Sequence, residues 1–232
     1  MATKIMIFTV MAMMMAMAVR CLDTNNVFNP CSDAKVKSRD GFTFGFAFSS
    51  KESFFDKQIQ LSPCDRRLAL GGTDARLAVF RPKVDELTYL TINRTDFDPV
   101  KAGGYMVAFA GRQYAARSIP TFVADKSNIV TSFTLVLEFE EGTLVDLHWK
   151  KFGCKSCAER SAICLNHQDC AMPISKCKAG GGSVDCKISV QLAFSGTDKA
   201  LEVLNSWYEV EQFRQYSLLG LYQDISGMVM GP

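Results

Sequence analysis

The sequence predicts a mainly β protein, with an antiparallel β-sandwich or barrel-like body, a disulfide-rich excursion and a C-terminal helix. Three observations carry this expectation. Several short segments alternate apolar with small or polar residues and are separated by glycine and proline, which is typical of half-buried strands. Six of the nine cysteines lie within residues 154–186. Apolar residues near the end of the chain recur at helical spacing.

The clearest strand signal lies at residues 42–48, where four phenylalanines at every second position alternate with Thr43, Gly45 and Ala47. Period two places all four rings on one face of a strand, whereas a helix would scatter them around its circumference. The same alternation predicts further strands, at residues 76–81, 87–93, 105–110, 129–140, 144–150 and 188–194.

The strongest pair of strands is expected at 129–140 and 144–150, joined by a hairpin turn at Glu141-Gly142. On the second strand the alternation places three side chains on one side: Val145, Leu147 and Trp149. A helix is expected from about residue 198 to about residue 214, because Ser195-Gly196-Thr197-Asp198 resembles a capping box in which Asp198 takes the place of the usual glutamate.

Residues 1–21 are predicted to be a signal peptide. Lys4 precedes an uncharged apolar stretch at residues 5–19, whose length suits a signal peptide and is short for an uncleaved membrane anchor. Cleavage is expected after residue 18 or 21. The mature chain is therefore expected to be secreted and to have no membrane span, and the triplet Asn93-Arg94-Thr95 is a candidate N-glycosylation site at Asn93.

The nine cysteines predict a disulfide framework, because thiols are normally oxidised in the secretory pathway. They are Cys21, Cys31, Cys64, Cys154, Cys157, Cys164, Cys170, Cys177 and Cys186. Cleavage after Cys21 leaves an even number. Our hypothesis is that Cys31 then pairs with Cys64 and that the remaining six pair among themselves, while spacing alone does not choose their connectivity.

The expected organisation is a signal peptide, a β body over 22–153, a cysteine-rich excursion from one sheet over 154–186, and a returning strand with a helix over 187–232. A separate small domain is the alternative for the cysteine-rich part. The Cys154–Cys157 spacing with His167 also resembles a zinc site, but export favours disulfides. We therefore expect no metal and no cofactor.

The charge pattern and the candidate catalytic residues do not define an enzyme. The net charge is +2 without runs of like charge, so no nucleic-acid partner is expected. His148 and His167 lack the nucleophile motif of a Ser-His-Asp hydrolase. Glycoside hydrolysis would need paired carboxylates, and the candidates near the predicted hairpin are Glu138, Glu140 and Asp146. The competing interpretation is a solvated outer face, since Glu138 and Glu140 point away from the apolar side of their strand.

Carbohydrate binding would instead use exposed aromatic side chains on a sheet. The candidates are Tyr89, Tyr105, Tyr114, Trp149, Trp207 and Tyr208. Most aromatic residues in a protein of this composition are expected in the core.

Five segments in order resemble the plant secreted proteins called Expp proteins. They are residues 20–26 (RCLDTNN), 78–86 (AVFRPKVDE), 103–112 (GGYMVAFAGR), 192–198 (LAFSGTD) and 204–208 (LNSWY). The resemblance covers most of the chain. It implies a plant source and an apoplastic or cell-wall setting, and no catalytic residues carry over from it.

These observations favour a non-enzymatic extracellular protein that binds cell-wall polysaccharide or another apoplastic protein. The first alternative is a cell-wall glycoside hydrolase that uses the carboxylates of the 138–146 hairpin. The second is a recognition role for the crosslinked excursion at 154–186.

Overall fold

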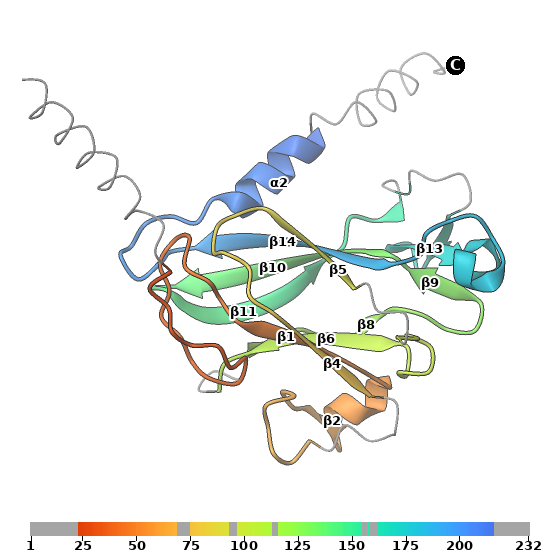
Figure 1. Cartoon of the computed structure of the whole chain (residues 1–232), viewed down its shortest axis with the longest axis horizontal. Helices are drawn as coiled ribbons and strands as arrows, with labels where there is room; N and C mark the ends of the chain where they lie inside the picture. Colours follow the sequence, from red (N-terminus) through yellow and green to blue (C-terminus); the bar gives the residue numbers. More distant parts are fainter. Residues whose placement is uncertain are drawn as a thin grey trace, which may run out of the picture.

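The computed structural model describes residues 23–68, 75–92, 97–112, 116–154, 157 and 162–215. The predicted signal peptide, Cys21, the Asn93 triplet and Tyr114 lie outside the described residues. The described part is mainly β, as predicted, and its two largest sheets form two layers (Figure 1). No helix within the described ranges combines the length and the apolar character needed to cross a membrane.

The first layer is a five-stranded antiparallel sheet in the order β4-β1-β6-β7, with β8 also paired to β6. Its strands are β1 (Phe44–Ser49), β4 (Arg76–Phe80), β6 (Tyr105–Ala110), β7 (Ala116–Arg117) and β8 (Thr121–Phe122). The second layer is a four-stranded sheet in the order β11-β10-β14-β5. Its strands are β5 (Thr88–Ile92), β10 (Ser132–Glu140), β11 (Thr143–Lys150) and β14 (Ile188–Gly196).

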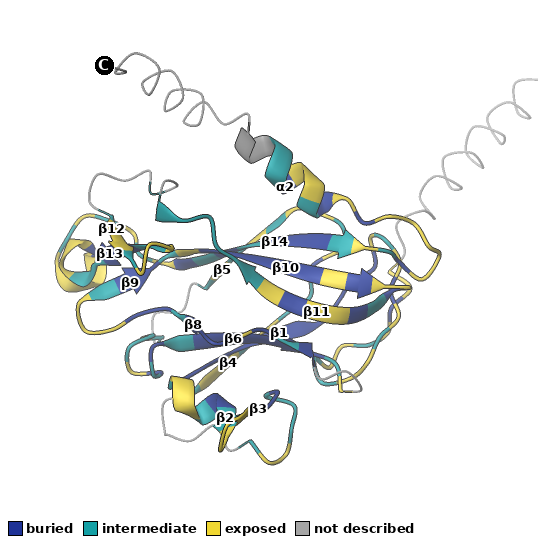
Figure 2. Ribbon diagram, turned by 180° about the vertical axis from the view of Figure 1, so that it is seen from behind, coloured by how far each residue is buried: buried dark blue, intermediate teal, exposed yellow. Residues whose placement is uncertain are grey.

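Aromatic side chains join the two layers. Phe46 of β1 is fully buried, and its ring stacks on that of Trp149 from β11 with the centroids 5.8 Å apart. Phe42, which precedes β1, meets Phe139 of β10 edge-to-face at 5.1 Å. Both contacts are geometries that aromatic pairs prefer. The alternating phenylalanines predicted from the sequence therefore lie between the sheets, in the buried strands of Figure 2.

The other face of β1 is also covered, which its alternating pattern did not predict. A short segment made of η2 (Lys51–Phe54), β2 (Phe55–Asp56) and β3 (Ile59–Gln60) packs there, with Phe54 against Phe109 and Ala47. A Cβ on Gly45 would lie 2.4 Å from the ring of Phe109. Only glycine lets that ring approach the strand so closely.

The β10–β11 hairpin forms where the sequence placed it. Glu140 pairs with Thr143, and the two turn residues, Glu141 and Gly142, both have positive φ, as a tight hairpin turn requires. A bulge between Glu138 and Phe139 shifts the register.

The bulge changes which residues of β11 face the core. Phe139 now pairs with Leu144. Leu144 is buried and Val145 is 37% exposed. The expectation that Val145 lies on the same side as Leu147 and Trp149 is therefore wrong.

All eight described cysteines are bridged, as Cys31–Cys64, Cys154–Cys164, Cys157–Cys170 and Cys177–Cys186. This confirms the hypothesis that Cys31 pairs with Cys64 and that the other six pair among themselves. Cys154 and Cys157 are bridged to different partners, so they have no thiolates to offer to zinc.

The cysteine-rich excursion leaves the four-stranded sheet after β11 and returns to it at β14. It contains β12 (Ile163–Leu165), β13 (Asp169–Pro173), η4 (Ile174–Lys176) and η5 (Lys178–Gly180). β13 pairs with β9 (Asn128–Val130) of the body. The long return makes β14 parallel to β10, whereas the other strand pairs of the two layers are antiparallel.

The C-terminal helix α2 spans Ser206–Gln215 and packs on β14. It begins about eight residues later than expected. Asp198 does not cap it, because its carboxylate accepts backbone N–H groups of Ser38, Ala200 and Glu202 in a loop. Asp85 from the β4–β5 connection instead accepts the N–H groups of Asn205 and Ser206 at the start of the helix, where unpaired donors need an acceptor.

Asp198 and Asp40 are buried carboxylates that tie the N-terminal segment to the end of the sandwich. Asp40 accepts the N–H groups of Thr24 and Lys37 at 2.7 and 2.8 Å, and the ammonium of Lys199 lies 3.7 Å away. Burial raises the pKa of each carboxyl, but the N–H donors and the nearby lysine charges outweigh it and hold both pKa values below the ordinary 3.8.

Acidification is expected to destabilise this end of the fold. Because the pKa of each carboxyl is lower in the folded chain, its contribution to stability is fully present above the ordinary aspartate pKa. The contribution is lost as the pH falls below about 4. Urea unfolding at a series of pH values should show that the free energy of unfolding falls below about pH 4. Asp198→Asn should reduce the dependence of this free energy on pH. A pH series unchanged by Asp198→Asn would contradict the assignment.

Candidate functional site

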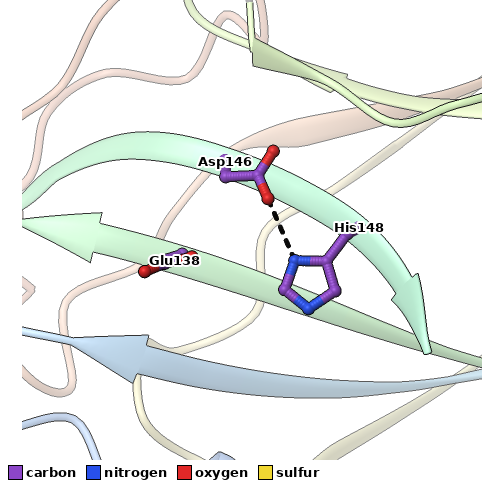
Figure 3. A group of neighbouring side chains, drawn as sticks. All are labelled: Glu138, Asp146 and His148. Carbon is purple, nitrogen blue, oxygen red and sulfur yellow. Dashed lines mark hydrogen bonds and ion pairs between the residues drawn. The ribbon is translucent and has the colours of Figure 1, made fainter.

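Two features of the described residues can recognise another molecule: a side-chain cluster on the outer face of the four-stranded sheet, and a cavity at one end of the sandwich. The cluster consists of Glu138 on β10 and of Asp146 and His148 on β11 (Figure 3). Asp146 and His148 are two residues apart on one strand, so they share a face. Glu138 is the cross-strand partner of Asp146.

The three side chains are close together and exposed. His148 Nδ1 lies 3.0 Å from Asp146 Oδ2, and the imidazole and carboxylate are 45% and 54% exposed. One donor atom from each of the three residues lies within 4.8 Å of the other two. Imidazole nitrogen and carboxylate oxygen are both metal-ligating atoms.

The cluster brings together two of the three carboxylates that the sequence suggested for glycoside hydrolysis, Glu138 and Asp146. Glu140 lies at an open hollow of the surface with Glu141 and Lys35. None of the described pockets is lined by Glu138 or Asp146. A glycosidase holds its two carboxyl groups across a cleft that encloses the sugar. No pocket found among the described residues is lined by two of the three candidates, Glu138, Glu140 and Asp146, so the geometry lends no support to the hydrolase alternative.

The second feature is a cavity of about 930 Å³ between the body and the cysteine-rich excursion. It lies at the end of the sandwich where Figure 1 labels β9 and β13. The Cys177–Cys186 bridge forms part of its wall. The cavity is within the size range of sites for small molecules, about 300–1,000 Å³.

The floor of the cavity is apolar. Its side chains come from the end of β5, the β5–β6 connection, β9, η4 and the start of β14: Ile92, Phe97, Ile129, Ile174 and Ile188. All five belong to the hydrophobic core or pack against it. The cavity therefore opens directly onto the core of the sandwich.

The rim of the cavity is charged and mainly basic. It carries four lysines and two aspartates: Lys101, Lys126, Lys178, Lys187, Asp98 and Asp185. Lys187 pairs with Asp185 at 3.3 Å. The carboxylate of Asp98 accepts backbone N–H groups of Val100 and Lys101.

The other three lysines form no ion pair within the described part of the chain. They leave a surplus of positive charge at the mouth of an apolar cavity. This combination suits a ligand with an apolar body and a negatively charged group.

The aromatic residues proposed for carbohydrate binding do not form one platform. Trp149 packs between Phe46 and Phe133, and its Nε1 donates to the carbonyl of Ile119. Tyr105 packs against Phe122. Trp207 lies under the ammonium of Lys150 at 5.0 Å, whereas Tyr89 and Tyr208 are about two-thirds exposed.

Sequence reasoning missed the cavity, because its lining residues are spread from Ile92 to Ile188. No local pattern marks them. The cluster could have been found, since Asp146 and His148 share a face of a predicted strand opposite Glu138.

The chain matches the profile of a protein family described as "Uncharacterised protein DDB_G0273449" over residues 1–129 and 121–230. The comparisons with curated proteins and with solved structures gave no match. Because the matched ranges together span almost the whole chain, the protein belongs to the family described as "Uncharacterised protein DDB_G0273449".

Proposed function

We propose that this protein is a secreted, non-enzymatic binding protein of the plant apoplast or cell wall, and that the cavity beside the Cys177–Cys186 bridge holds its ligand. The observation that carries the binding role is the cavity itself, with its apolar floor and lysine rim. The ligand class is a small amphipathic anion, such as a molecule with a hydrocarbon body and one carboxylate.

Export is supported by the sequence pattern of residues 1–21 and by the number of cysteines. Four disulfides within the described residues are compatible with an oxidising compartment. The plant setting is supported by the resemblance to Expp proteins. Asn93 is the proposed glycosylation site of the exported chain.

The chemistry of the cavity favours an amphipathic ligand over a neutral polysaccharide. Sugar-binding sites present exposed aromatic faces and hydrogen-bonding groups, whereas the floor here is four isoleucines and one phenylalanine. Burying a hydrocarbon chain on such a floor contributes roughly 0.8 kcal/mol per CH₂ group. The lysines then select for a negative charge at the open end.

The full chain, expressed in plant cells, is expected in the apoplastic wash fluid, and protein purified from it should bind dodecanoate in calorimetric titrations. Dodecanol tests the apolar part of the ligand alone, and acetate tests the charge alone. Dodecanoate should bind about fivefold more tightly than dodecanol, which corresponds to about 1 kcal/mol from the exposed lysines. It should bind far more tightly than acetate, which lacks the hydrocarbon chain.

Variants locate the binding. Lys126→Gln with Lys178→Gln should weaken dodecanoate about fivefold and leave dodecanol unchanged. Ala179→Trp should block both ligands, since Ala179 lines the cavity. Lys176→Gln is the matched control, because Lys176 is exposed on η4 and does not line the cavity.

Three outcomes would contradict the proposal: retention of the chain inside the cell, equal binding of dodecanol and dodecanoate, or binding of pectin fragments with no binding of dodecanoate. The last result would favour a wall polysaccharide as the ligand.

A further inference from the structure

The outer face of the β10–β11 hairpin carries a side-chain cluster that is separate from the cavity. Its residues are Glu138, Asp146 and His148, and none of them lines the cavity. All three project from paired strands, which hold their Cα atoms in register. The cluster therefore depends on the backbone of a sheet and not on a loop.

The spacing of the donor atoms suits a metal ion. Zinc lies about 2.0–2.1 Å from nitrogen and oxygen ligands in a tetrahedral arrangement, so two of its ligands are about 3.3 Å apart. The 3.0 Å between His148 Nδ1 and Asp146 Oδ2 is close to this spacing. The ligand atoms of the three side chains are at most 4.8 Å apart. Rotation of the exposed Glu138 side chain can bring its carboxylate closer to the other two.

The charges of the cluster also favour a cation. Glu138 and Asp146 are directly opposite each other on the two strands, an arrangement that is destabilising for like charges. Neither forms an ion pair with a lysine or arginine within the described ranges. The nearest lysine along β11, Lys150, has its partners on α2 instead. Its ammonium lies 3.7 Å from the carboxylate of Glu211 and 5.0 Å from the centroid of the Trp207 ring.

We infer that Glu138, Asp146 and His148 form a binding site for a divalent first-row transition-metal ion, with Zn²⁺ as the probe. The imidazole distinguishes such an ion from Ca²⁺ and Mg²⁺, which prefer all-oxygen ligands. Three protein ligands leave coordination positions open on the solvent side. No described cysteine competes for the ion, because all eight are bridged.

The test uses the full chain after a chelator has removed any bound metal. The protein is titrated with Zn²⁺, and separately with Ca²⁺, in a calorimeter. One Zn²⁺ site is expected, with Ca²⁺ at least about tenfold weaker. The sequence contains only two histidines. Imidazole signals in NMR spectra should therefore show directly that Zn²⁺ perturbs the ring of His148 and leaves that of His167 unchanged.

Matched variants separate ligands from bystanders. Glu138→Gln and His148→Ala should each weaken Zn²⁺ at least about tenfold, and both positions are exposed, so the fold should persist. Glu140→Gln removes the same charge from the same face of β10 and should leave the affinity unchanged. His167→Asn, which suits the positive φ of His167, should also bind normally.

Equal losses in Glu138→Gln and Glu140→Gln would overturn the site, because they would indicate general attraction of the ion to an acidic face. Full affinity in His148→Ala would overturn it as well, as would Ca²⁺ binding as tight as Zn²⁺ binding. These outcomes leave the cavity proposal untouched, since the two sites share no residue.

Discussion

Replacing Phe46 with alanine is expected to lower the free energy of unfolding by about 3–5 kcal/mol. The Phe46 ring is fully buried. It contacts Phe44 and Phe80 within its own sheet at centroid distances of 5.2 and 5.5 Å, and Trp149 of the opposite sheet at 5.8 Å. Alanine removes all three ring contacts and leaves a cavity that the rigid sheets fill only in part.

Urea unfolding measures the loss, followed by far-UV circular dichroism and by tryptophan fluorescence. The fluorescence of the folded variant should also differ, because Trp149 loses its stacking partner. Tyr208→Ala is the control. It removes an aromatic ring that is 64% exposed and should change stability by no more than about 0.5 kcal/mol. A loss below about 1 kcal/mol in Phe46→Ala would show that the two layers do not pack through this ring.

Removing the Cys31–Cys64 bridge, by replacing both cysteines with serine, is expected to cost about 3–4 kcal/mol. The bridge closes a stretch of 33 residues, and restricting so long a loop lowers the entropy of the unfolded chain. It also holds the η2–β2–β3 segment over Ala47, Val107 and Phe109. Without it, Phe54 loses support and the outer face of the five-stranded sheet becomes accessible to water.

The Cys177–Cys186 bridge provides the comparison, since it closes only nine residues. Its double serine variant should lose about 2.5 kcal/mol, less than the Cys31–Cys64 variant. It should also weaken binding in the cavity, because both cysteines form part of the wall. Urea unfolding ranks the two variants, and the reverse order would mean that local packing, not loop length, governs their stability.

The sequence alone predicted the strands whose side chains alternate in a simple way. Period two in β1 and β10 places the large apolar side chains of each strand on one face, and this requirement is local to each strand. The other face of β10 carries Glu138 and Glu140, whereas the other face of β1 is buried under the η2–β2–β3 segment. The Glu141-Gly142 turn was equally predictable, because two positive φ angles in a two-residue loop favour glycine. The Cys31–Cys64 bridge was predicted from the even number of cysteines that the expected cleavage leaves and from the separation of these two from the other six. The three bridges among the other six were not, because spacing alone does not choose their connectivity.

The sequence was misleading about the start of the helix and the faces of β11, where contacts with other segments override the local pattern. Asp198 has the residue type of a helix cap, but its carboxylate accepts the N–H group of Ser38, about 160 residues earlier, and those of Ala200 and Glu202 in its own loop. Leu201 has a positive φ, which does not fit a right-handed helix. The helix therefore begins after it, at Ser206, where Asp85 supplies an acceptor. The bulge at Glu138 likewise reversed the expected faces of Leu144 and Val145 without any local mark in the sequence.

The sequence by itself thus determined the class of the fold, the crosslinked excursion and the outward direction of Glu138 and Glu140, because each depends on near neighbours in the chain. Only the tertiary structure decided where the cavity lies. The cavity exists because the return of the excursion to β14 brings the end of β5, β9 and η4 together around one space. Such a meeting of segments depends on long-range strand pairing and disulfides, and no short-range pattern of residues encodes it.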